Sequence, residues 1–142
     1  MKYINIIIFL VITSLAHAEN KLQQEQKKYI ENGFNLIKQP NLESLLINQS
    51  FDIVFQNDIY PYFVNENGKY LIEVKNRNKV FSRKWEIKNN QFCVQSLRGG
   101  NLCITLLQKD NKYVGCSSRE MGCYYKFQNF NSGDIKKLKN KF

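Results

Sequence analysis

From Ser50 onward, apolar and polar residues alternate in short segments that predict β-strands. Phe51, Ile53 and Phe55 share one face of the first segment, the period-two spacing of a strand with one buried face. Clusters of Asn, Gly and Asp separate the segments, among them Asn67-Gly68, a dipeptide typical of tight hairpins. The expected strands are 51–55, 59–64, 69–74, 80–87, 91–95, 102–107, 112–116 and 124–130. They predict a mainly β (α+β) fold: a small antiparallel barrel or sandwich of about seven to eight strands.

The segment before the strands, residues 19–49, has helical periodicity. Apolar residues recur near one face between Asn20 and Lys38, although Gly33 interrupts the pattern and Pro40 ends it. Asn41 is expected to cap a second short helix that runs through Leu46. One or two N-terminal helices packed over the sheet are therefore expected.

The first eighteen residues have the pattern of a secretory signal peptide. A positive start is followed by an apolar run from Tyr3 to Leu15 and by the small-x-small triplet Ala16-His17-Ala18. The run is too short for a stable membrane span, so no transmembrane segment is expected after cleavage. Because His17 is the only histidine, the cleaved chain would have none.

The four cysteines predict two disulfides, since an even number in an exported chain is typical of a disulfide framework. They are Cys93, Cys103, Cys116 and Cys123. Sequence alone leaves several pairings open. We favour Cys93–Cys103 and Cys116–Cys123, because each closes a short loop between neighbouring strands. No Cys-x-x-Cys is present, so we expect neither a metal site nor another cofactor.

The chain is basic, with a formal net charge of +9, which favours anionic partners: an anionic glycan, lipopolysaccharide or an acidic protein. Export argues against nucleic acid. Five basic residues gather on one predicted hairpin with aromatic residues nearby: Lys75, Arg77, Lys79, Arg83 and Lys84. They form a candidate site for anionic groups. The alternative is an ordinary solvated hairpin over an aromatic core.

The organisation expected along the chain has four parts: a signal peptide (1–18), a helical segment (19–49), an antiparallel β domain (50–131) and a basic tail (132–142). Lysines dominate the tail, and we expect it to be frayed and solvated.

Several short motifs are similar to those of a family of small bacterial periplasmic β-rich domains of unknown function. The motifs are Leu42-Glu43-Ser44-Leu45-Leu46, Asn48-Gln49-Ser50-Phe51, the segment Tyr62 to Tyr70, Lys84-Trp85-Glu86-Ile87, Phe92-Cys93 and Leu102-Cys103. The resemblance covers roughly Asn41 to Tyr113. Arg83 stands where that family has a glycine, and Cys116 and Cys123 are additional. The resemblance implies a fold and a compartment but no reaction and no catalytic residues.

Three functions remain as hypotheses. The first is a secreted or periplasmic non-enzymatic binding domain that acts through loops or a barrel mouth. The second is a secreted inhibitor of an enzyme, presenting a loop such as Leu97 to Asn101. The third is a histidine-free hydrolase, for which Ser82 and Lys84 on one strand face are candidates. The oligomeric state is left open.

Overall fold

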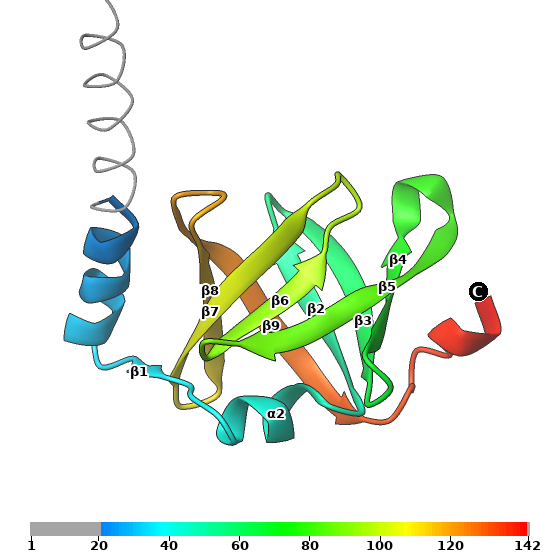
Figure 1. The fold of residues 1–142 in the computed structure, drawn as a ribbon, viewed down its shortest axis with the longest axis horizontal. Coiled ribbons are helices and arrows are strands. Elements are labelled where there is room, and N and C mark those ends of the chain that lie inside the picture. The colour runs from blue at the N-terminus through cyan, green and yellow to red at the C-terminus, as the bar shows by residue number, and fades with distance from the viewer. Residues whose placement is uncertain (1–20, 142) are drawn as a thin grey trace, which may run out of the picture.

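Eight antiparallel strands form a closed barrel (Figure 1). The structure, a computed structural model, describes residues 21–141. Each strand from β2 to β9 pairs with the next along the chain, and β9 pairs back with β2. The strands are β2 (Gln49–Phe55), β3 (Asp58–Asn65), β4 (Lys69–Val74), β5 (Lys79–Lys88), β6 (Gln91–Gln95), β7 (Asn101–Lys109), β8 (Lys112–Ser117) and β9 (Gly122–Ser132). The mainly β prediction is confirmed, and the barrel is the arrangement formed.

A short helix closes one end of the barrel. Because successive strands are antiparallel, the connections between them lie alternately at the two ends of the barrel. The helix α2 (Asn41–Leu46) lies at the closed end (Figure 1), where Leu42 and Leu46 are wholly buried in the core. Asn41 was expected to cap this helix. Pro40 instead occupies the capping position, and no side chain caps it.

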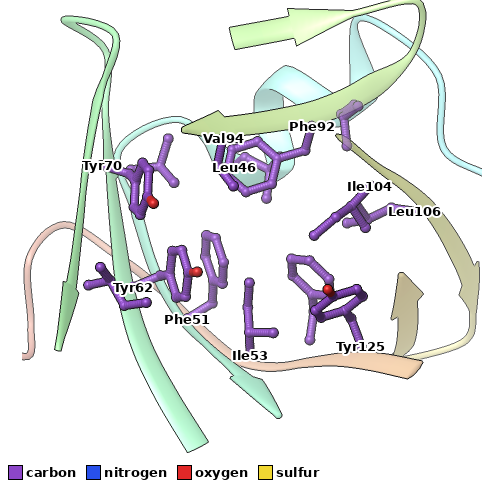
Figure 2. Packing of buried hydrophobic residues seen from close by; sticks show 14 of the residues in the cluster. Leu46, Phe51, Ile53, Tyr62, Tyr70, Phe92, Val94, Ile104, Leu106 and Tyr125 are labelled. Carbon is purple, nitrogen blue, oxygen red and sulfur yellow. The ribbon is translucent and has the colours of Figure 1, made fainter. Parts of the chain in front are cut away.

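The opposite end, which we call the open end, carries four connections between strands. They are residues 56–57, 75–78, 96–100 and 118–121. The second of these contains the 3-10 helix η1 (Lys75–Arg77). Inward-facing aromatic and aliphatic side chains from the strands line the barrel interior (Figure 2).

The N-terminal helix is shorter than the periodicity predicts. Residues 21–31 are helical, and the expected helix to Lys38 is wrong in its last part. Gly33 takes a φ of 87°, a left-handed conformation that glycine adopts without steric cost. The chain then extends into the two-residue strand β1 (Asn35–Leu36), which pairs with β7. Within residues 21–141, no helix has the length and apolar character needed to cross a membrane.

The N-terminal helix and the residues after it cover part of the outer barrel wall. Leu22, Tyr29 and Phe34 pack against an outward-facing apolar cluster on β7, β8 and β9. This cluster consists of Leu107, Val114, Cys116 and Cys123. The helix therefore packs against the outside of the barrel, whereas α2 packs into its end.

The C-terminal segment is docked on the barrel, so the expectation of a frayed, solvated tail is wrong. Leu138, at the start of the 3-10 helix η2 (Leu138–Lys141), is wholly buried. It packs on Phe63, Leu71 and Val80, which point outward from β3, β4 and β5. The Lys136 ammonium lies 2.5 Å from the carboxylate of Asp52, a residue that is only 6% exposed. An apolar contact and an ion pair thus both hold the segment.

β5 divides its pairing between two neighbours. Residues 79–84 pair with β4, whereas residues 85–88 pair with β6. The edge of β5 that faces away from β4 has no strand partner over residues 79–84 among residues 21–141. The β4–β5 hairpin consequently extends away from β6 at the open end (Figure 1).

Two disulfides join neighbouring strands near the open end. Cys93 bonds to Cys103 across β6 and β7, and Cys116 bonds to Cys123 across β8 and β9. These are the pairs that the short hairpin connections favoured. The expected signal peptide, residues 1–18, lies outside the described residues.

Candidate functional site: the barrel interior and its mouth

A cavity of about 430 Å³ occupies the open half of the barrel. Its walls are mainly aromatic and aliphatic side chains that point inward from β2, β3, β4, β6, β7 and β9. Ligand pockets of a few hundred Å³ with apolar walls and a few polar groups are typical of small-molecule sites, and an eight-stranded barrel is wide enough to hold one small ligand. α2 closes the far end, so the cavity has one mouth, at the open end.

Four tyrosines supply the phenol groups of the cavity wall. They are Tyr60, Tyr62, Tyr70 and Tyr125. The rings of Tyr62 and Tyr70 stack with centroids 5.3 Å apart, and Figure 2 shows both on the same side of the barrel interior. The ring of Tyr125 stacks on Phe55 with centroids 4.8 Å apart. Stacked rings hold each other in place, so the wall is formed before any ligand arrives.

The hydroxyl groups of these tyrosines differ in their partners. The Tyr70 hydroxyl donates to the Gln95 carbonyl oxygen at 2.8 Å, and the Tyr125 hydroxyl lies 3.4 Å from a Glu120 carboxylate oxygen. Among residues 21–141, the Tyr62 hydroxyl has no hydrogen-bond partner. It is therefore free to bond to a molecule inside the barrel.

Burial keeps the phenols protonated. Removal from water disfavours the charged form and raises the pKa of Tyr70 to about 12. Burial likewise raises the pKa of Tyr62 well above its ordinary value, and that of Tyr125, where Glu120 adds to the effect. At neutral pH the wall offers neutral hydroxyl groups, which are hydrogen-bond donors and acceptors.

Charged side chains gather at the mouth. Arg98 lies on the β6–β7 connection, and Arg119 and Glu120 lie on the β8–β9 connection. Arg119 Nη2 donates to the Gly99 carbonyl oxygen at 2.7 Å, which ties the two connections together. Each arginine lies within a loop that a disulfide closes. The disulfides therefore restrict the backbone that carries both arginines.

The five basic residues singled out in the sequence lie along the β4–β5 hairpin, outside the barrel cavity. Lys75, Arg77 and Lys79 are exposed around the β4–β5 connection. Arg83 is partly buried and donates to the Ser82 carbonyl oxygen at 2.8 Å. Lys79 and Arg83 lie over the Phe81 ring, at 5.4 Å and 5.7 Å from its centroid. None of these groups lines the barrel cavity.

Lys84 stands opposite Lys69 in the register of β4 and β5. Both border an open crevice on the outer wall, together with Ser82, Arg83 and Gln95. Ser82 and Lys84, the candidate pair for a hydrolase, thus border a crevice on the outer wall, separate from the barrel cavity.

The expected inhibitor loop, Leu97 to Asn101, forms one side of the mouth. Leu97 and Arg98 line the cavity, and the Ser96 amide donates to the Gly100 carbonyl oxygen at 2.9 Å. Within residues 21–141, no three His, Cys, Asp or Glu side chains gather closely enough to hold a metal ion.

Sequence reasoning placed Tyr60 and Tyr62 only among the aromatic residues near the basic hairpin. It assigned Tyr70, Tyr125 and Arg119 to no site. Tyr62 and Tyr70 follow the alternation of their strands and read as ordinary core residues. A usable signal was present: phenol groups recur at inward positions of several strands, where aliphatic residues fill a core more simply. Nothing local identifies Arg119, since its place at the mouth depends on barrel closure.

Comparisons with protein-family models, with curated proteins and with solved structures each find no match to this chain.

Proposed function

We propose that this chain is an exported, non-enzymatic binding domain that takes one small, largely apolar molecule into its barrel. The observation that carries the proposal is the cavity of about 430 Å³, walled by stacked aromatic rings and open at one end. The partner-free hydroxyl of Tyr62 supports it, because such a group gives a ligand a hydrogen bond inside an apolar wall.

Two features support export of the chain from the cytoplasm. The two disulfides fit an oxidising compartment, and the first eighteen residues have the pattern of a signal peptide. A periplasmic or extracellular location is therefore part of the proposal.

The chemistry of the cavity favours binding over catalysis. Tyrosine hydroxyls with raised pKa values are poor bases and poor nucleophiles at neutral pH. The single carboxylate among the lining residues, Glu120, lies at the mouth beside Tyr125. This arrangement suits reversible binding of a ligand without a chemical reaction.

The proposal is tested with N-phenyl-1-naphthylamine, a neutral apolar probe whose fluorescence rises when it leaves water. Titration of the purified chain should show saturable binding with one site per chain. Leu102→Trp should abolish binding, because Leu102 lines the cavity and an indole there fills the space. Ile30→Trp is the control, since Ile30 is 53% exposed on the N-terminal helix.

Circular dichroism of both variants checks that the barrel is intact. Absence of saturable binding to the unmodified chain would contradict the proposal. Equal binding by folded Leu102→Trp and Ile30→Trp would also contradict it, because the probe would then lie outside the barrel.

Enzyme inhibition is the second candidate function, and the fixed conformation of the loop at residues 96–100 favours it. Backbone hydrogen bonds inside the loop and the contact from Arg119 fix its shape, and pre-formed loops bind partners with less loss of entropy. Affinity capture from envelope extract separates the two candidates, because an inhibitor retains one protein at fixed stoichiometry.

A further inference from the structure

The mouth of the barrel carries a guanidinium group without a partner. Among residues 21–141, the Arg98 guanidinium group makes no ion pair and no hydrogen bond. The backbone amide of Arg98 donates to the Ser96 hydroxyl. Arg119 faces the same cavity from the next connection and uses one nitrogen to bond Gly99. The remaining donors of both groups are available to a ligand.

The residues that line the cavity include two arginines and one carboxylate, and a second carboxylate, that of Asp58, lies 3.4 Å from the Tyr60 hydroxyl. Glu120 is the only acidic residue among those that line the cavity, and it makes no ion pair of 4.0 Å or less with either arginine. Its carboxylate is instead close to the Tyr125 hydroxyl. Burial raises the pKa of Tyr60 and that of Tyr125, the carboxylates of Asp58 and Glu120 add to the rise, and the positive charge of Arg98 opposes it at both phenols. Its positive charge therefore reaches phenols on two walls of the cavity.

The cavity thus changes character from its mouth to its interior. Two arginines stand at the mouth, whereas the interior is lined by residues such as Ile53, Ile72 and Ile104 together with the tyrosine rings. A molecule complementary to this arrangement has an apolar body and a charged group at one end.

We propose that the barrel binds anionic amphiphiles: molecules with an apolar body and one carboxylate, sulfate, sulfonate or phosphate group. The anionic group lies between Arg98 and Arg119, and the body lies against the tyrosine and aliphatic walls. This inference rests on the proposed function, because it names the ligand class of the same cavity. Guanidinium groups suit such anions, since they donate charge-assisted hydrogen bonds in a planar fork.

Two matched probes test the inference. N-phenyl-1-naphthylamine and 1-anilinonaphthalene-8-sulfonate have the same aromatic body, but only the second carries a sulfonate. The sulfonate probe should bind about tenfold more tightly at low salt, which is the size expected for one charge-assisted hydrogen bond. The difference should shrink as salt is added, because the mouth is open to solvent.

Variants locate the anionic group. Arg98→Gln should weaken binding of the sulfonate probe far more than binding of the neutral probe, and so remove most of the preference. Arg77→Gln is the matched control, because it removes a guanidinium group from the neighbouring β4–β5 connection without touching the cavity. Arg119→Gln also loses the bond to Gly99, so Arg119→Lys is measured beside it to retain the charge.

The outcomes separate this inference from the proposed function. Binding of the neutral probe without tighter binding of the sulfonate overturns the inference and leaves the proposed function standing. Binding of neither probe overturns both. Equal effects of Arg98→Gln and Arg77→Gln overturn the inference as well, because net charge would then explain the preference.

Discussion

Tyr62 and Tyr70 show how two similar residues can serve different purposes. Their rings stack and both are nearly inaccessible. The Tyr70 hydroxyl bonds to the Gln95 carbonyl oxygen at the end of β6, so it helps to hold β4 beside β6. The Tyr62 hydroxyl has no such bond among residues 21–141. At the residue scale, one phenol is structural and the other is available to a ligand.

This difference predicts the effects of removing each hydroxyl. Tyr70→Phe should lower the free energy of unfolding by about 1 kcal/mol, because a buried hydrogen bond is lost. Tyr62→Phe should change it by less than about 0.5 kcal/mol, because no protein bond is lost. Urea denaturation of both variants measures the two values. A larger loss for Tyr62→Phe would show that this hydroxyl has a structural partner after all.

At the scale of elements, both terminal segments cover apolar parts of the outer wall. The N-terminal helix covers the cluster around Leu107 and Val114, and η2 covers Phe63, Leu71 and Val80. Asp134 accepts hydrogen bonds from the amides of Leu138 and Lys139, both at 2.8 Å, and so fixes the start of η2. The barrel strands therefore have apolar residues on both faces, inside and out.

The docking of η2 predicts a large effect at one leucine. Leu138→Ala should lower the free energy of unfolding by about 2–5 kcal/mol, the usual cost of truncating a buried leucine. Ile135→Ala should cost less than about 0.5 kcal/mol, because Ile135 is 55% exposed in the same segment. Denaturant unfolding measures both. Similar small values for the two variants would mean that the segment is detached in solution.

The strands were predictable because period-two alternation is a local property. All eight barrel strands begin and end within two residues of their expected limits. The C-terminal segment was not predictable, because its four lysines indicate solvation whereas Leu138 and Lys136 find partners on strands far away in sequence. The end of the first helix was missed because residues 35–36 pair with β7, a contact made only in the folded barrel.

The candidate site was less predictable than the fold. Charge clustering directed attention to Lys75, Arg77 and Lys79, which are sequence neighbours on an exposed connection. Arg98 and Arg119 are separated in sequence, and the barrel brings their connections together. The mouth is built from several strand connections that come together only when the barrel closes. The local sequence pattern of any one connection therefore does not reveal it.

At the scale of the molecule, the disulfides lie where the barrel is least supported. α2 packs into the closed end, whereas no helix of the described residues covers the cavity mouth. Both disulfides join hairpins whose connections carry the arginines of the mouth. Stability and site geometry are therefore linked in the same two hairpins.

Reduction should affect both properties. Thiol titration of the denatured, unreduced chain should find none, and after reduction it should find all four cysteines. Reduction should lower the free energy of unfolding by about 2–5 kcal/mol. It should also weaken binding of the sulfonate probe more than binding of the neutral probe. Free thiols before reduction would contradict the two disulfides.

The unpaired edge of β5 has a consequence for how the chain behaves at high concentration. Exposed strand edges invite pairing with a second copy and so promote aggregation. Over residues 79–84 this edge carries Lys79, Arg83 and Lys84, and Arg83 already occupies the Ser82 carbonyl oxygen. Two copies that approached edge to edge would bring like charges together. The basic residues on this edge therefore disfavour edge-to-edge pairing of two copies, whatever the barrel binds.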